Sequence, residues 1–201
     1  MKYAIKATIK NIIVAFLIVI AFFGLIYVFL GRKIELNISL INKIAVDTSS
    51  KKNEVMSIDL DTNKIQNYPE YGTQYATIEI PKINVDLPVY FGSTLDVLKN
   101  GVGHDSASFF PGEGGSIIYM GHNSQNVFRR FSELSKGDEI TIKAAYGEFK
   151  YKIYDMKLVD ETDLAALPIQ KDEEILMCYT CYPFNNIGYA TQRYVVYAKP
   201  V

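Results

Sequence analysis

Nineteen consecutive residues near the N-terminus of this chain carry no charge. Residues 12–30 read IIVAFLIVIAFFGLIYVFL. As a helix this run spans roughly 28 Å at about 1.5 Å per residue, close to the roughly 30 Å hydrocarbon thickness of a bilayer. The run lacks the polar stripe of a buried core helix, and no small-residue cleavage site of a signal peptide follows it. It therefore predicts an uncleaved transmembrane anchor.

The charges that flank the apolar run indicate its orientation and the domain organisation. Lysines without any acidic residue precede the run, whereas the basic residues after it are soon followed by an acid. The positive-inside rule then places residues 1–11 in the cytoplasm and the rest of the chain outside the cell membrane. Residues 31–71 show no clear periodicity and are predicted to be an extracellular linker. One domain is predicted over residues 72–201.

Composition and charge exclude several classes of protein. The chain has 21 basic and 22 acidic side chains and a net charge of −1, so no basic excess points to nucleic acid. Its 49% hydrophobic and 21% charged residues are typical of a globular protein rather than a disordered one. Two cysteines are too few for a disulfide scaffold. The domain after the linker must therefore be stabilised by a hydrophobic core of its own.

From about residue 76 the sequence changes to short β-rich runs separated by turn residues. About seven or eight such runs predict a mainly β domain, a single antiparallel barrel or sandwich. Pro88 lies inside the run at 85–90, which is therefore predicted to be an edge or irregular strand. Only residues 95–99 and 126–134 are predicted to form short helices.

Three chemically useful side chains stand at the ends of predicted strands. Cys181 closes a strand that Pro183 stops. His122 closes another strand, and Arg193 opens the last one. An imidazole can take the proton of a thiol, and a guanidinium can donate hydrogen bonds to a carbonyl oxygen as that oxygen gains charge. Together the three residues point to acyl transfer through a thioester, although each taken singly is also a common core or surface residue.

Cys178 and Cys181 lie three residues apart, which raises two other interpretations. One is a redox pair, and the other is a zinc site completed by His104 and His122. In an extended strand, side chains three residues apart point to opposite faces. This geometry opposes an internal disulfide and weakens the zinc interpretation, so no metal site is predicted.

The order of these residues resembles that of the sortases, the membrane-anchored cysteine transpeptidases of Gram-positive bacteria. His122 comes first, a Thr-Cys pair ending at Cys181 follows, and Arg193 lies on the last strand. From about residue 76 to its end the chain looks like the class D subgroup of the family. One difference is that residues 177–181 read MCYTC where the family usually has TLxTC. The matching motifs are IPKINVDLPV at 80–89, GVGH at 101–104, PGEGG at 111–115, MGHN at 120–123, TCYPFN at 180–185 and RYVVYA at 193–198.

The resemblance implies a sortase-like closed β-barrel of about eight strands with short helices. It implies that Cys181 attacks the threonyl carbonyl of an LPxTG-like sorting signal, that His122 carries the proton and that Arg193 stabilises the oxyanion. Thr180 is expected to contact the substrate beside the nucleophile. The implied partners are secreted proteins with a sorting signal and an amine acceptor, either a peptidoglycan cross-bridge precursor or a pilin lysine. His104, which lies in a glycine-rich loop, is expected to be structural.

Further expectations concern the substrate groove and metal ions. Leu167, Pro168 and Ile169 are apolar enough to form a wall for a Leu-Pro pair, or equally to cover the barrel as a short helix. The alternative to an enzyme is a membrane-tethered β-barrel binding module without catalysis. No cofactor is predicted, because the acids that a calcium site would use, as in some family members, lack a recognisable ligand spacing: Glu113, Asp160, Glu161 and Asp163.

Overall fold

The structure is a computed structural model of the 201-residue chain. It describes residues 16, 19–21, 56–59, 62–185 and 189–201. The predicted cytoplasmic N-terminus, most of the predicted anchor and the first part of the predicted linker lie outside the described residues. Within the described part of the chain, no helix is both long and apolar enough to cross a membrane. The chain divides into two units, Met1–Ile38 and Ser39–Val201.

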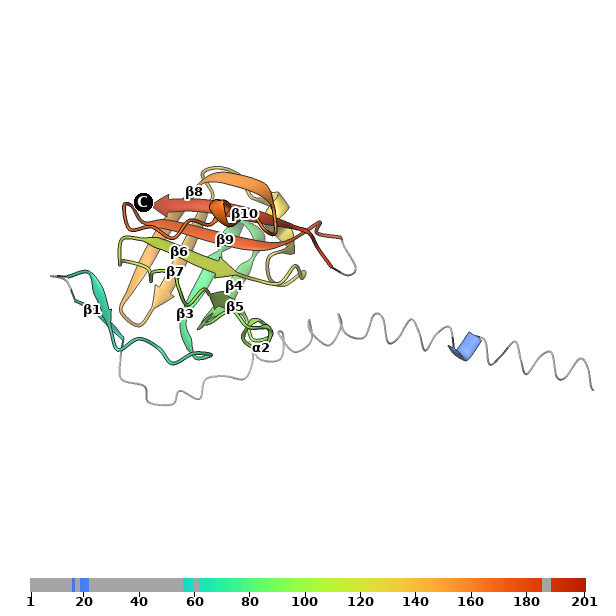
Figure 1. Ribbon diagram of the computed structural model, residues 1–201, viewed down its shortest axis with the longest axis horizontal. Coiled ribbons are helices and arrows are strands. Elements are labelled where there is room, and N and C mark those ends of the chain that lie inside the picture. The colour runs from blue at the N-terminus through green and yellow to red at the C-terminus, as the bar shows by residue number, and fades with distance from the viewer. Residues whose placement is uncertain (1–15, 17–18, 22–55, 60–61, 186–188) are drawn as a thin grey trace, which may run out of the picture. The chain divides into compact units, whose positions relative to one another are not determined.

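Eight strands of the second unit close into one barrel (Figure 1). Around the barrel the strands follow the order β10-β8-β7-β3-β4-β5-β6-β9, and β9 pairs in turn with β10. This topology confirms the predicted closed barrel of about eight strands. The strands are β3 (Gln74–Ile80), β4 (Val85–Phe91), β5 (Val102–His104), β6 (Ser116–Met120), β7 (Glu139–Ala144), β8 (Gly147–Asp160), β9 (Ile175–Tyr182) and β10 (Gln192–Pro200).

Two pairs of neighbouring strands run parallel, so the prediction of a wholly antiparallel sheet is wrong. β4 pairs with β5 in parallel, and β6 pairs with β9 in parallel. Parallel neighbours need a crossover connection rather than a tight turn. The chain makes one crossover through the helix α2 (Leu95–Leu98) and the other through β7 and β8. Pro88 pairs with Thr77 of β3 and lies just before the pairing of β4 with β5 begins at Val89, so this part of β4 has one strand partner, as an edge position does.

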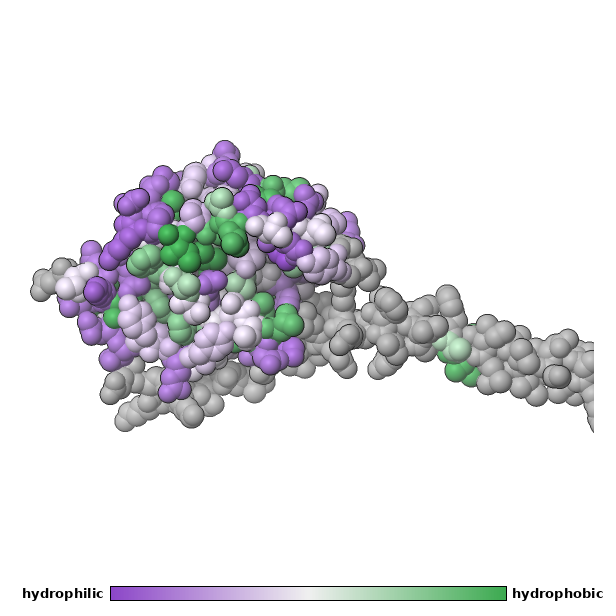
Figure 2. Space-filling model, viewed as in Figure 1, coloured by the Kyte–Doolittle hydropathy of each residue, from purple (hydrophilic) through white to green (hydrophobic). Residues whose placement is uncertain are grey.

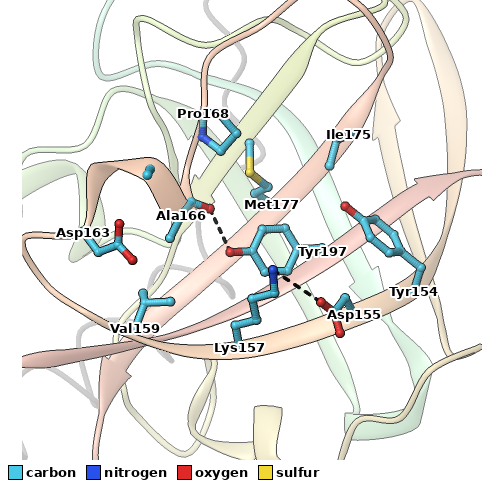
Figure 3. A pocket seen from close by; sticks show the side chains of 11 residues that line it. Tyr154, Asp155, Lys157, Val159, Asp163, Ala166, Pro168, Ile175, Met177 and Tyr197 are labelled. Carbon is cyan, nitrogen blue, oxygen red and sulfur yellow. Dashed lines mark hydrogen bonds and ion pairs between the residues drawn. The ribbon is translucent and has the colours of Figure 1, made fainter.

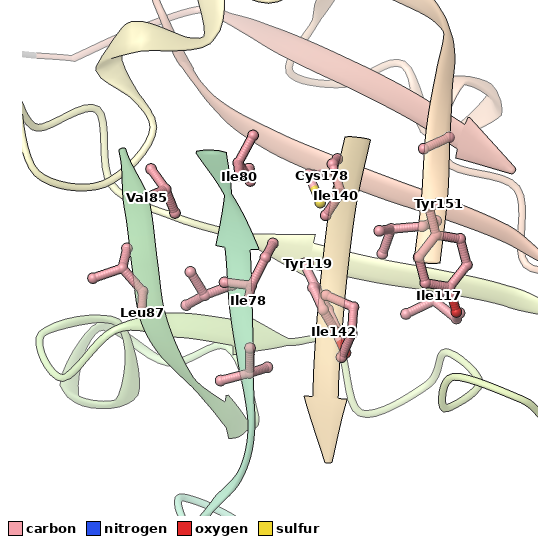
Figure 4. Close-up of a cluster of buried hydrophobic side chains, with 14 of the residues drawn as sticks. Ile78, Ile80, Val85, Leu87, Ile117, Tyr119, Ile140, Ile142, Tyr151 and Cys178 are labelled. Atoms are coloured by element: carbon pink, nitrogen blue, oxygen red, sulfur yellow. The ribbon is translucent and has the colours of Figure 1, made fainter. Parts of the chain in front are cut away.

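Strand alternation fills the barrel with apolar side chains (Figure 4). Ile78 and Ile80 of β3, and Ile140 and Ile142 of β7, are fully buried in this core. Each such side chain stabilises the fold by about 1.5–3 kcal/mol relative to an exposed one. Because strand side chains alternate, residues next to the inward-pointing ones face the outside of the barrel. On β9 the residues of the barrel core are Leu176 and Cys178, so Met177 and Tyr179 face outward.

The helices are short and lie in the connections, as predicted. α2 occupies the predicted helix at 95–99. The predicted helix at 126–134 contains η2 (Arg129–Glu133), a 3-10 helix between β6 and β7. Two single 3-10 turns, η1 (Pro81–Ile83) and η3 (Leu164–Ala166), complete the set. Of these, η3 matters most for function, because it precedes the strand that carries Cys181.

A two-stranded hairpin packs against the barrel from within the segment predicted as a linker. It consists of β1 (Ser57–Asp59) and β2 (Lys64–Gln66). Ile65 is 3% exposed and belongs to the barrel core. Its N–H donates to Oε1 of Glu113 at 3.1 Å, and the hydroxyl of Tyr68 donates to the same oxygen at 2.7 Å. Glu113 therefore fastens the hairpin to the barrel.

Candidate active site

The parallel pairing of β6 with β9 brings the segment that carries His122 to the end of the strand that carries Cys181. Met120 pairs with Tyr179, and the N–H of Gly121 donates to the carbonyl of Tyr179 at 3.1 Å. His122 and Cys181 each lie two residues beyond this last pair, at the same edge of the sheet. Neighbouring strands lie about 4.8 Å apart, so two residues that are distant in sequence occupy adjacent positions.

The antiparallel pairing of β9 with β10 adds Arg193 to the same end of the barrel. Arg193 pairs directly with Cys181. Directly paired residues of antiparallel strands have their Cβ atoms about 4.5–5.5 Å apart on one face of the sheet. This is the outer face, because Met177 and Val195, further along the two strands, belong to an apolar cluster separate from the barrel core. The structure thus brings the three predicted side chains to one outer edge of the barrel.

His122 is partly buried, and this burial lowers the pKa of its imidazole below the usual value. The ring is therefore neutral at pH 7, which is the form that can accept a proton. Its Nε2 atom is buried and has no hydrogen-bond partner among the described residues. The preceding residue must be glycine, because a Cβ on Gly121 would lie 2.5 Å from Cδ2 of Phe128.

Two hydrogen bonds fasten the end of β6 to the end of β9. Oγ1 of Thr180, a residue only 1% exposed, donates to the carbonyl of Gly121 at 2.8 Å. Nδ2 of Asn123 donates to the carbonyl of Pro183 at 3.0 Å, and Arg129 donates in turn to Oδ1 of Asn123 at 3.3 Å. These bonds fix the loop of the imidazole relative to that of the thiol. The substrate contact predicted for Thr180 stays a prediction. In the structure its hydroxyl bonds the Gly121 carbonyl and so supports the end of β6.

The guanidinium of Arg193 is held by the chain around it. Nη1 donates to the carbonyl of Ala190 at 2.7 Å, and Nη2 donates to Oε2 of Glu161 at 2.9 Å. Glu161 follows β8, so this ion pair connects the loop after β8 to the strand β10. A fixed guanidinium needs no reorganisation when negative charge develops beside it.

The two cysteines and His104 have different environments. Cys178 and Cys181 are both free, and burial raises the pKa of the Cys178 thiol well above its usual value. Cys178 is therefore an inert core residue, whereas Cys181 is partly exposed on the outer face. His104 is fully buried, with Nδ1 hydrogen-bonded to the hydroxyl of Tyr75 at 2.8 Å and Nε2 to that of Ser108 at 2.9 Å. These contacts make His104 structural and support neither the redox nor the zinc interpretation.

Three of the four acids considered for calcium are engaged within the protein, and the fourth, Asp163, lines the pocket described below. Besides Glu113 and Glu161, Asp160 accepts hydrogen bonds from the hydroxyl of Thr162 at 2.6 Å and from its N–H at 2.9 Å. Over residues 56–59, 62–185 and 189–201, no group of three or more His, Cys, Asp or Glu side chains is arranged to hold a metal ion. The expectation of no cofactor, with calcium as its alternative, therefore stays a prediction.

A pocket of about 360 Å³ opens on the outer face of the barrel (Figure 3). Met177 of β9 and Tyr197 of β10 line it, and so does Lys157 of β8. The hydroxyl of Tyr197 donates to the carbonyl of Ala166 at 2.8 Å, which attaches η3 to the strands. Figure 2 shows apolar residues gathered over the part of the surface where Figure 1 labels β9 and β10.

The three residues predicted to form a substrate wall have separate positions. Pro168 lines the pocket. Leu167 packs against the outer apolar cluster, and Ile169 is 52% exposed. On β9, Met177 and Cys181 point to the same face and lie four residues apart, about 13 Å along the strand. A ligand held in the pocket can therefore extend along β9 to reach the thiol.

The arrangement can carry out acyl transfer. An imidazole follows the end of β6, a guanidinium held by the chain belongs to the residue paired with Cys181, and a pocket with apolar and charged lining lies on the outer face of β9. Sequence reasoning missed Asn123 and Glu161 as parts of this site. The MGHN motif gave a signal for Asn123, since the residue adjoins His122. Nothing local signalled the role of Glu161, because its partner lies on a distant strand.

The chain is similar in sequence and in fold to proteins of one family. A model of the sortase domain matches residues 78–201. Over 155 residues the chain is 43% identical to Sortase D of Bacillus subtilis (strain 168), covering 77% of this chain and 76% of that protein. The solved Sortase D5 transpeptidase of Clostridium perfringens superposes with a TM-score of 0.61 at 34% identity, covering 67% of this chain and 82% of that one. Sortase C from Clostridium perfringens SM101 superposes with a TM-score of 0.59 at 28% identity, covering 69% of this chain and 77% of that one.

Proposed function

This chain belongs to the sortase family, of class D type, and we propose that it cleaves an LPxTG-like sorting signal after Thr and transfers the released protein to an amine. Enzymes of this family are transpeptidases. The observation that carries the proposal is that Cys181 pairs with Arg193 on one side, while on the other side the pairing of β9 with β6 ends two residues before Cys181 and two residues before His122.

The first half of the proposed reaction forms a thioester. The neutral imidazole of His122 takes the proton of the Cys181 thiol, and the sulfur attacks the threonyl carbonyl of the signal. Arg193 donates hydrogen bonds to the oxygen that becomes negative. When the peptide bond breaks, the imidazolium of His122 gives its proton to the leaving amine. Cys181 then holds the substrate protein as an acyl-enzyme.

The second half of the proposed reaction reverses the roles with a new amine. An acceptor amine attacks the thioester carbonyl, His122 takes the amine proton, and the Cys181 sulfur leaves. We propose a peptidoglycan cross-bridge precursor or a pilin lysine as the acceptor. The pocket beside Met177 and Pro168 is an apolar place for the Leu-Pro part of the signal. Such a substrate would be a secreted protein.

The proposed setting of the enzyme is the outer face of a Gram-positive cell membrane. The support is the uncharged run at residues 12–30 and the lysines that precede it. The domain would then act on secreted proteins that pass close to the membrane.

Mass spectrometry of the protein incubated with a library of LPxTG-like peptides tests the proposal. We expect an acyl adduct on Cys181, its absence in Cys181→Ala, and its retention in the control Cys178→Ala, since Cys178 is buried in the core. Thiol-reactive probes should label Cys181 selectively, and a sorting peptide should protect it. A non-catalytic binding module predicts slow labelling of Cys181, no protection by the peptide and no adduct, and this result would reject the enzyme.

Arg193→Lys tests the oxyanion role. Lysine keeps the charge but lacks the planar fork of donors, so we expect thioester formation to slow by a factor of roughly 100 to 1,000, the typical effect of losing an oxyanion donor. A rate close to that of the parent would remove Arg193 from the mechanism.

A further inference from the structure

Arg193 is the most heavily hydrogen-bonded member of the site. Nη1 donates to the carbonyls of Ala190 at 2.7 Å and Gln192 at 2.9 Å, and Nη2 donates to Oε2 of Glu161 at 2.9 Å. A guanidinium has five N–H groups in one plane. Within the described part of the chain, these contacts occupy Nη1 and one N–H of Nη2. The N–H of Nε and the second N–H of Nη2 stay available for a substrate oxygen.

Glu161 is itself fixed at both ends. Its N–H donates to the carbonyl of Thr191 at 2.8 Å, which continues the pairing of β8 with β10 beyond Asp160 and Gln192. Its Oε1 accepts a hydrogen bond from the hydroxyl of Tyr189. One oxygen of the carboxylate therefore accepts a hydrogen bond from the loop before β10, and the other accepts one from the guanidinium.

The ion pair between Glu161 and Arg193 is shielded from water on both sides. The side chains are 20% and 23% exposed, respectively. By contrast, the ion pair between Glu79 and Lys143 on β3 and β7 is 31% and 45% exposed. Charge-assisted hydrogen bonds weaken with exposure because water and salt screen them. The pair at the site is therefore able to hold a guanidinium in one orientation.

We infer that Glu161 is a positioning residue, which orients Arg193 for the substrate. The inference rests on the proposed function. Glu161 itself does not line the pocket, and two residues separate it from η3.

A double-mutant cycle tests the inference through the rate of acyl-enzyme formation in the full chain, followed by mass spectrometry. The single variants are Glu161→Gln and Arg193→Ala, and the double variant combines them. Glu161→Gln keeps the shape of the side chain and removes its charge. We expect it to slow thioester formation roughly tenfold to a hundredfold, mainly in kcat, as expected for a misplaced catalytic group. In the Arg193→Ala background the same change should alter the rate less than twofold.

Two further variants keep the result interpretable. Tyr189→Phe removes the hydroxyl that donates to Oε1, and we expect an intermediate loss of rate. Glu79→Gln breaks the comparable ion pair away from the site and should change the rate less than twofold. Thermal unfolding of each variant separates loss of folding from loss of orientation.

The outcomes distinguish this inference from the proposed function. If the parent protein forms the adduct but Glu161→Gln reacts at the parental rate, or faster, Glu161 does not position Arg193. An equal loss in the parental and Arg193→Ala backgrounds also overturns the inference, because the effect then does not pass through the guanidinium. If the parent forms no adduct with any peptide, the proposed function fails and the inference fails with it.

Discussion

Replacing Thr180 by Val removes the hydroxyl that ties the catalytic strand to the end of β6. Thr180 is buried, and its Oγ1 donates to the carbonyl of Gly121 at 2.8 Å. Valine has nearly the same volume, so no cavity forms. A buried acceptor that loses its donor costs about 1–3 kcal/mol. The extra methyl group recovers at most about 1 kcal/mol, so we expect a net loss of about 1–2 kcal/mol in the free energy of unfolding.

This loss is small against the roughly 5–15 kcal/mol that stabilises a typical domain, so the variant stays folded at 25 °C. Its chemistry should suffer more than its stability. Gly121 is next to His122, and releasing its carbonyl lets the imidazole move relative to the thiol. Because displacements of about 1 Å can cost a hundredfold in rate, we expect acyl-enzyme formation to slow at least tenfold.

Thr180→Ser is the matched control. Serine keeps the hydroxyl but loses a methyl group, which also costs about 1 kcal/mol. Urea unfolding should therefore find both variants destabilised by similar amounts. Mass spectrometry of the acyl-enzyme should separate them, with Thr180→Ser within about twofold of the parent. The reasoning is refuted if Thr180→Val reacts as fast as the parent, or if Thr180→Ser is as slow as Thr180→Val.

Three other predictions concern separate parts of the domain. Burial lowers the pKa of His104 to about 3, so the unfolded chain takes up a proton first as the pH falls below about 6.5. Urea unfolding at several pH values should find that the free energy of unfolding falls by about 2 kcal/mol between pH 6.5 and 4.5, and falls less in His104→Gln. An equal fall in both proteins would contradict this. Asn123→Ala removes the bond to the Pro183 carbonyl and should slow acyl-enzyme formation roughly tenfold, while an unchanged rate would show that the loops hold without it. Tyr151→Phe deletes a 2.7 Å hydrogen bond to Glu174 and should lower the free energy of unfolding by about 1.5–3 kcal/mol; a loss under about 0.5 kcal/mol in urea unfolding would count against it.

The sequence predicts the strands and the ends of strands well, because both depend on local pattern. The alternation at 139–143 becomes β7, and the short helix at 95–99 becomes α2. Pro183 stops the strand that contains Cys181, and the next strand begins near Arg193. Both residues are therefore predicted at strand ends. The family resemblance then supplies the closed barrel, which the alternation alone did not distinguish from a sandwich.

What could not be predicted depends on contacts between distant parts of the chain. Period-two alternation says which face is buried but not whether a neighbour runs parallel, so the joint of β6 with β9 was missed. Glu161 reads as one acid among several in a polar loop, and only the register of β8 with β10 places it on Arg193. Likewise Ile65 lies in a weakly patterned segment and is assigned to the core only by its tertiary contacts.

The strand that carries Cys181, β9, joins two parts of the barrel that are far apart in the sequence. β9 has β6 on one side, far back along the chain, and β10 on the other. Bringing such remote segments together costs loop-closure entropy. The contacts that offset this cost form only when the sheet is completed. If Cys181 is the nucleophile as proposed, a nascent or partly unfolded chain lacks the assembled site, and acylation waits until the sheet is complete. For the same reason, the alkylation rate of that sulfur is a direct kinetic probe of the last step of assembly.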